Sequence, residues 1–335
     1  MRRPAALVIS VLAASGALAV AFGAGGLGST LSQGLSAVAA ADRKLLWAAG
    51  LAFTASLLAN AAAWRSTINA VGARMSRKDA CANYGVGSIV NTLLPARLGD
   101  AVRVGLFARA LPPEQTGKGL TAAGALGAVS AAEALTQVPL LGAASGLGVV
   151  PWWSAIVVVG VGSAVVALMA ATSGRLQGRL RPLLAASRAL RASRRRAVPL
   201  LLWSAAATVG RVLAAAAIAA ALGAANPLEA GVIVSAALCL ATAVPLTPGN
   251  VGVTSGAVML ALHARGVPLT SAVGAGLAFH AVETAAGLAF GIAGTIVLAR
   301  DRSVAARRRS LTLAGGLALL LVAVAALGTT VFPAA

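Results

Sequence analysis

The sequence predicts an all-α protein, a polytopic membrane helix bundle of about seven spans plus two re-entrant segments. Three observations predict this class. Hydrophobic residues make up 59% of the 335 residues and charged residues 10%, whereas soluble proteins are roughly 45–50% apolar and about 25% charged. The apolar residues stand in long runs rather than in amphipathic stripes. The basic residues gather in short segments between these runs, as the positive-inside rule describes.

Seven stretches are long enough to cross the hydrocarbon core, which requires about 20 mostly apolar residues. They are residues 5–24, 45–64, 119–149, 152–172, 198–223, 270–299 and 311–332. The first follows Arg2 and Arg3 and contains Ala19-Val20-Ala21, so residues 1–21 also resemble a cleavable signal peptide. Because many apolar segments follow, we expect an uncleaved first helix.

The basic residues predict the orientation. Of the 27 Lys and Arg residues, 23 lie before residue 4 or in the segments 65–118, 174–196 and 300–309. These segments are cytoplasmic under the positive-inside rule, so we expect a plasma-membrane protein with a cytoplasmic N-terminus. Segment 80–95 must then enter and leave by the cytoplasmic face, and segment 230–262 by the outer face. Such re-entrant backbone is tolerated only where it is buried in protein or lines a wet cavity.

Internal similarity predicts inverted repeats within a single membrane domain, residues 1–335. The predicted first repeat is 45–172 and the second 198–332, joined by a basic cytoplasmic loop at 174–196 and preceded by an extra helix and loop at 1–44. The matches are Leu45-Leu46-Trp47-Ala48 with Leu201-Leu202-Trp203-Ser204, Pro95-x-x-x-Gly99 with Pro248-x-x-x-Gly252, and Glu133 with Glu283. In the predicted topology the matched helices run in opposite directions, as in inverted-topology transporters. Chance matching in an Ala-, Gly- and Leu-rich chain is the alternative.

Several classes of function are disfavoured. The net charge of +19 is accompanied by only 4% aromatic residues, so we expect anionic lipid rather than nucleic acid as the counter-charge. Cys81 and Cys239 lie far apart in apolar surroundings, which predicts neither a disulfide nor a metal site. No Walker loop, GxSxG, HExxH or EF-hand loop is present, so we expect no enzyme and no cofactor.

The first chemical motif runs from Asn91 to Arg103. Pro95 suits the first turn of a helix, and Arg97, Asp100 and Arg103 then share one helix face. Two guanidiniums with a carboxylate between them are suited to holding a phosphate. The alternative is an ordinary helix start with a surface ion pair.

The second motif contains Pro245, Pro248, Gly249, Asn250 and Gly252. Two prolines and two glycines interrupt a helix, and the freed backbone N–H groups are suited to an anionic headgroup. A tight structural turn between two helices is the alternative.

Four ionisable residues lie within predicted spans, namely Glu133, Arg211, His280 and Glu283. Ionisable residues at this depth are costly, and they usually face a bundle interior. We expect Arg211 to lie within reach of one glutamate, and both glutamates to face one cavity where the two Pro/Gly segments meet. A buried structural ion pair is the alternative.

These motifs resemble the lysylphosphatidylglycerol synthase transmembrane region, a flippase-like membrane family. The resemblance covers about residues 45–300. It is carried by Tyr84 and Gly85, the Asn91–Arg103 motif, the Pro245–Gly252 motif and Gly266.

The resemblance implies a transporter that moves lipids or lipid-linked sugars between leaflets. Its expected substrate is an anionic or polyprenyl-linked (glyco)lipid, with membrane lipids and a lipid-modifying enzyme as partners. In fused synthases a soluble domain makes the aminoacylated lipid, and we expect no such activity in this sequence. The alternatives are a non-transporting partner of a glycosyltransferase or lipid synthase, and a membrane enzyme acting on lipid phosphate.

Overall fold

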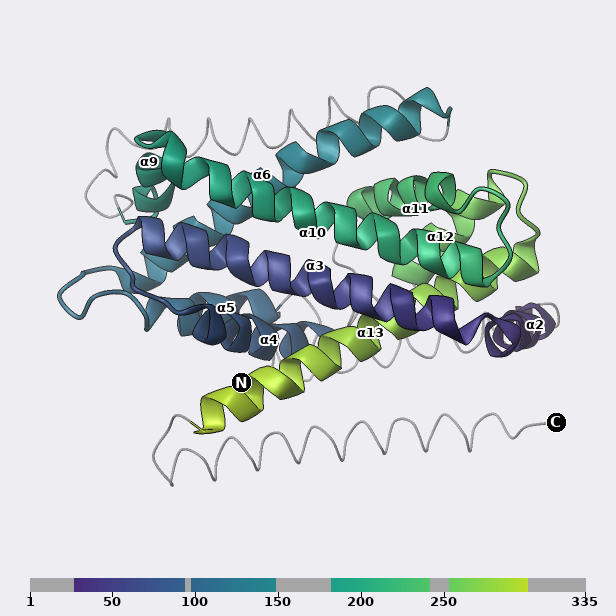
Figure 1. Cartoon of the computed structure of the whole chain (residues 1–335), viewed down its shortest axis with the longest axis horizontal. Coiled ribbons are helices and arrows are strands. Elements are labelled where there is room, and N and C mark those ends of the chain that lie inside the picture. Colours follow the sequence, from purple (N-terminus) through teal and green to yellow (C-terminus); the bar gives the residue numbers. More distant parts are fainter. Residues whose placement is uncertain (1–26, 94–97, 149–181, 242–252, 301–335) are drawn as a thin grey trace, which may run out of the picture.

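The computed structural model describes residues 27–93, 98–148, 182–241 and 253–300, and the regular secondary structure in these ranges is α-helical. Figure 1 shows long helices lying side by side with shorter helices between and beside them. The helices are α2 (Leu27–Ala40), α3 (Arg43–Ala70), α4 (Arg77–Leu93), α5 (Leu98–Ala108), α6 (Lys118–Gly146), α9 (Ala185–Arg191), α10 (Arg194–Ala221), α11 (Pro227–Ala241), α12 (Val253–His263) and α13 (Leu269–Arg300).

Four described helices are long and apolar enough to cross a membrane: α3, α6, α10 and α13. The shortest of them has 28 residues, which at 1.5 Å per residue is about 42 Å, longer than the hydrocarbon core of about 30 Å. They confirm four of the predicted spans, with ends that differ by a few residues. The spans predicted at 5–24, 152–172 and 311–332 lie outside the described residues, so the total number stays a prediction.

The outer faces of these helices carry large apolar side chains. On α3, Trp47 and Leu51 are 76% and 69% exposed, and on α10, Leu202 is 64% exposed. A soluble protein rarely leaves so much contiguous apolar surface in water. These faces therefore suit contact with lipid, whereas the interior consists largely of alanine and glycine.

Helices α3 and α10 form an antiparallel central pair. At one end the Asp42 N–H donates to the Ala221 carbonyl oxygen at 3.2 Å, and at the other Arg196 Nη1 donates to the Ala70 carbonyl oxygen at 3.3 Å. Between them Ser56 Oγ donates to the Ala207 carbonyl oxygen at 2.9 Å. The two Leu-Leu-Trp segments thus lie on helices of opposite direction.

The interrupted segment 80–95 lies largely in one short helix, α4, which packs against α5 just after the segment, and segment 230–262 contains two short helices, α11 and α12, that pack against each other. The longest of these helices, α4, has 17 residues and is about 26 Å long. It is therefore too short to cross the hydrocarbon core of about 30 Å. Figure 1 shows the two pairs toward opposite ends of the bundle. Whether they are re-entrant in a membrane stays a prediction.

Glycines allow α4 and α13 to approach closely. A Cβ added at Gly85 would lie 2.8 Å from the Phe290 carbonyl oxygen, and one at Gly294 would lie 2.7 Å from the Ala82 carbonyl oxygen. Small residues bring backbones together in membrane bundles, where the hydrophobic effect no longer drives helices together. This contact ties the first described half of the chain to the last helix.

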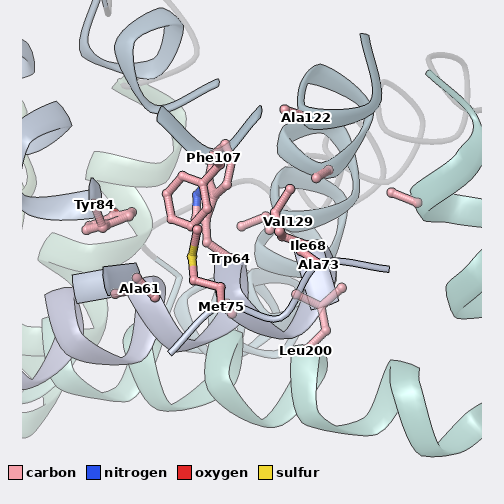
Figure 2. Close-up of a cluster of buried hydrophobic side chains, with 14 of the residues drawn as sticks. Ala61, Trp64, Ile68, Ala73, Met75, Tyr84, Phe107, Ala122, Val129 and Leu200 are labelled. Carbon is pink, nitrogen blue, oxygen red and sulfur yellow. The ribbon is translucent and has the colours of Figure 1, made fainter. Parts of the chain in front are cut away.

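A hydrophobic cluster ties α3 to α4, α5 and α6 (Figure 2). The rings of Trp64 and Phe107 lie 4.6 Å apart, and Tyr84, Met75 and Val129 belong to the same cluster. Aromatic pairs of this kind contribute about 0.5–1.5 kcal/mol beyond the area they bury. The cluster fixes α5 against α3 and so positions one wall of the site.

Two short helices lie where loops were predicted. Residues 27–40, expected as loop, form α2, which packs on α13, with Gly34 against Val273 and Gly274. The prediction was wrong here because Gly, Ser and Thr interrupt the apolar run, yet small residues suit packing on the small residues of α13. Within the predicted basic loop 174–196, α9 buries Ala186 and Leu190 against the bundle.

The repeat boundaries, 45–172 and 198–332, include ranges outside the described residues and stay predictions. The described parts nevertheless share one order of helices. In each half a long helix is followed by two short helices and a second long helix: α3 to α6, then α10 to α13.

Candidate functional site

A cavity of about 310 Å³ lies inside the bundle. Its lining comes from the four long helices α3, α6, α10 and α13 and from both pairs of short helices. Described residues of the segments 80–95 and 230–262 therefore line one cavity, while the meeting of the two Pro/Gly motifs there stays a prediction. Pro95 and Pro248 themselves lie outside the described residues.

On one wall, Arg103 of α5 is buried and its three nitrogens all donate hydrogen bonds. Nη1 lies 2.6 Å from Asp100 Oδ1, Nη2 donates to Ser88 Oγ at 2.8 Å, and Nε donates to the Tyr84 carbonyl oxygen at 3.4 Å. The guanidinium also lies 3.8 Å from the centre of the Tyr84 ring. Asn91 Nδ2 completes this Arg103 cluster by donating to Asp100 Oδ1 at 3.1 Å.

The cluster depends on a close approach of α4 and α5. A methyl group at Gly99 would overlap the Gly87 carbonyl oxygen, and one at Gly87 would overlap the Arg103 side chain. Glycine at both positions leaves room for the guanidinium to reach back to α4. This gives Gly99, part of the first motif, a steric reason.

Arg211 of α10 is held much more loosely. Its Nη2 lies 3.8 Å from Glu133 Oε1 of α6, and the two side chains are 38% and 29% exposed. No hydrogen bond of Arg211 is found among the described residues. The expectation that Arg211 lies within reach of a glutamate is confirmed. One helical turn away, Thr136 and Thr208 join the same two helices through a 3.1 Å hydrogen bond.

Glu283 and His280 of α13 line the same cavity. Glu283 is exposed along it and has no ion-pair partner within 4.0 Å among the described residues. Arg211 lines the same cavity. His280 Nδ1 is buried and lacks a hydrogen-bond partner in the described part of the chain. Both glutamates thus face the cavity, as expected.

Sequence reasoning missed several uncharged polar groups of the cavity. Asn60 on α3, Ser88 on α4 and Gln137 on α6 line it; Asn60 Oδ1 is buried without a hydrogen-bond partner in the described residues, and Gln137 Oε1 accepts from Cys239 Sγ at 2.6 Å. An amide in the middle of an apolar run is the signal that would have found Asn60 and Gln137, because such groups need partners in the membrane.

The predicted site residues fall into two groups. The structure brings seven to the cavity: Asn91, Asp100, Arg103, Glu133, Arg211, His280 and Glu283. The remaining predicted residues lie outside the described ranges: Pro95, Arg97, Pro248, Gly249, Asn250 and Gly252.

The charge of Arg103 is compensated within its own cluster. The surface ion pair considered as the alternative is wrong for this residue, because its side chain is only 10% exposed and faces the interior. Gly266, also part of the family resemblance, has φ +81° in the turn before α13, a conformation that glycine adopts without strain.

The described residues contain no group of three or more His, Cys, Asp and Glu side chains arranged to hold a metal ion. The chemistry of the lining is that of paired charges, amides and hydroxyls. It is suited to holding a polar or ionic group inside an apolar bundle.

Comparison with curated proteins gives no match. Comparison with protein families gives a match over residues 6–291 to the family described as Lysylphosphatidylglycerol synthase TM region. The match covers most of the chain. It includes the Arg103 cluster, the segments 80–95 and 230–262, and the cavity residues Glu133, Arg211 and Glu283. The chain is therefore a multi-pass membrane protein that belongs to the lysylphosphatidylglycerol synthase transmembrane-region family, a family of lipid biosynthesis or translocation.

Proposed function

We propose that this protein is a flippase-like transporter that moves an anionic or polyprenyl-linked (glyco)lipid between membrane leaflets without changing it chemically. The observation that carries the proposal is the single cavity lined by charged and polar groups from both halves of a membrane bundle. A charged headgroup crossing the hydrocarbon core needs such groups, because an unpaired charge there is costly.

The volume of the cavity suits a headgroup rather than a whole lipid. Ligand cavities are commonly roughly 300–1,000 Å³, and this one, about 310 Å³, lies at the lower limit. In the proposed mechanism a phosphate-containing headgroup enters the cavity while its chains remain in the bilayer. Arg211 is partly exposed and loosely paired, so it contacts the phosphate when the headgroup displaces Glu133.

The proposal includes inverted repeats. Their support is the shared order of helices, the antiparallel α3 and α10, and the two pairs of short helices at opposite ends. The pairs α4/α5 and α11/α12 are proposed to be re-entrant from opposite faces, with the N-terminus in the cytoplasm of a plasma-membrane protein. Cysteine labelling tests this orientation: an impermeant reagent added outside intact cells should modify Asn226→Cys but not Ser187→Cys.

Reconstitution tests the transport. The protein is placed in liposomes with a panel of lipids labelled on the headgroup: phosphatidylglycerol, its aminoacylated form and a polyprenyl phosphate. At least one lipid should change leaflet faster than in empty liposomes. Arg97→Gln should abolish this movement while expression is unchanged, because Arg97 is the predicted phosphate ligand of the first motif.

The control variant is Glu229→Gln. Glu229 pairs with Arg265 away from the cavity, so its loss should leave lipid movement intact. Movement of no lipid in the panel would favour the non-transporting partner, and release of a chemically altered lipid would favour an enzyme. Unchanged movement in Arg97→Gln would remove that residue from the site.

A further inference from the structure

Among the residues that the structure describes, the charges lining the cavity do not balance. Among its described lining residues are three carboxylates, Asp100, Glu133 and Glu283, against two guanidiniums, Arg103 and Arg211. Asp100 and Arg103 are held together by the 2.6 Å contact and by three further hydrogen bonds of their cluster. One guanidinium, that of Arg211, therefore remains for two glutamates.

Arg211 and both glutamates line the same cavity. Arg211 lies 3.8 Å from Glu133 of α6, too far for a hydrogen bond, and Glu283 of α13 lines the cavity with it. The long side chain is partly exposed, so it has room to move. The two glutamates occupy matching positions in the two halves of the sequence.

A carboxylate without a cation is unstable inside a membrane bundle, and it takes up a proton instead. We propose that Glu283 is a proton-binding site and that Arg211 exchanges between Glu133 and Glu283, so that the glutamate without the guanidinium holds the proton. This inference rests on the proposed transport function, to which it adds a coupling ion.

The exchange balances in atoms and charge. In the structure Arg211 pairs with Glu133, and Glu283 takes a proton from water on an Oε atom to become a neutral acid. When Arg211 moves to Glu283, that proton returns to water and Glu133 takes one up. The two glutamates hold one proton and one guanidinium in both states, so the net charge of the described lining does not change. The move replaces a tie between α10 and α6 by a tie between α10 and α13.

Other titratable groups face Glu283 across the cavity. Those of the described lining, besides Glu133 and Arg211, are Tyr84 on α4, Asp100 and Arg103 on α5, Cys239 on α11 and His280 on α13. The described residues of α2, α3 and α12 add no titratable group to the lining. His280 is one turn from Glu283, and its buried Nδ1 has no hydrogen-bond partner in the described structure, so it is suited to relay the proton.

Infrared spectroscopy tests the proposal without a transport assay. The purified protein in phosphatidylcholine vesicles at neutral pH should show the C=O stretching band of a protonated carboxylic acid. Glu283→Gln should abolish this band. Glu133→Gln should abolish it too, because it frees Arg211 to pair with the intact Glu283. A carboxylic acid that is independent of Arg211 would keep its proton in that variant.

Two further variants complete the test. Arg211→Gln should increase the band about twofold, since both glutamates then lack a cation, and it gives a result even where Glu133→Gln fails to fold. Glu229→Gln, which removes a paired glutamate outside the cavity, should leave the band unchanged.

A band that survives Glu283→Gln, or that is unaffected by both Glu133→Gln and Arg211→Gln, would overturn the proposal. The expected band pattern in a protein that moves no lipid would overturn the transport function and leave the proton site standing. Lipid movement without this band pattern would support the transport function and overturn the proton site.

Discussion

Two arginines line the same cavity, yet their surroundings differ in every respect that determines what a charge can do. Arg103 is buried, and its three nitrogens donate to Asp100, Ser88 and the Tyr84 backbone. Arg211 is 38% exposed, and its one ion pair among the described residues is the 3.8 Å contact with Glu133. A guanidinium with all its nitrogens engaged holds helices together, whereas a loosely paired one is available to a ligand. The residue type alone does not distinguish the two roles.

The stability that each ion pair contributes is expected to differ between Arg103 and Arg211 in the same way. Removing one partner of a buried ion pair costs about 3–5 kcal/mol, because the other charge remains buried without compensation. A partly exposed pair contributes only about 0–1 kcal/mol. The comparison between the Arg103 cluster and the Arg211 pair therefore predicts opposite effects on stability and on transport.

The largest effect on stability is expected at Arg103. Arg103→Gln should lower the free energy of unfolding by about 3–5 kcal/mol, since Asp100, which is only 22% exposed, would lose its cation. Reversible unfolding in mixed detergent micelles, followed by circular dichroism, measures this loss. The double variant Arg103→Gln/Asp100→Asn should recover most of it. A single variant as stable as the parent would erase the distinction from Arg211.

A smaller loss is expected where the backbones of α4 and α5 approach. Gly99→Ala should cost about 1–3 kcal/mol, because the added methyl group meets the Gly87 carbonyl oxygen and forces the two helices apart. Gly105→Ala is the matched control on the same helix. Nothing lies within 4 Å of a Cβ there, and alanine in a helix is favoured over glycine by roughly 0.5–1 kcal/mol.

The same unfolding assay compares these two variants. Equal stability of Gly99→Ala and Gly105→Ala would show that the Arg103 cluster tolerates a wider spacing of α4 and α5. In that case the fixed position of Arg103 would have to come from its hydrogen bonds alone.

The parts of the fold that sequence predicted well are those set by local composition. The four described spans were predicted because a long apolar run is sufficient to specify a membrane helix. Helix α2 was not predicted, because its stability comes from packing Gly34 on α13 rather than from its own apolar content. The Asn, Pro and Gly residues of 80–95 and 230–262 indicated that these stretches are not plain spans.

The ionisable residues of the cavity could be predicted from the sequence, but the contacts that pair them with other side chains could not. An ionisable residue in an apolar run indicates an interior position, and this placed Glu133, Arg211, His280 and Glu283 correctly on one cavity. The contacts of Arg103 with Ser88 and Tyr84 depend instead on how closely α4 approaches α5. Side-chain spacing along one helix carries no information about that distance.

The smallest change in stability, with a large change in transport, is expected at Arg211. Arg211→Gln removes a loose and partly exposed pair, so the free energy of unfolding should change by less than about 1 kcal/mol. Movement of the transported lipid should nevertheless fall at least tenfold, since the headgroup phosphate loses its accessible cation. Arg211→Lys should keep part of the movement, because lysine retains the charge but binds phosphate as a point charge without the planar fork. Unfolding in detergent and lipid movement in liposomes are measured on the same preparations, so the two effects separate within one experiment. If Arg211→Gln instead destabilised the protein as strongly as Arg103→Gln, both arginines would be structural and the headgroup would need another cation.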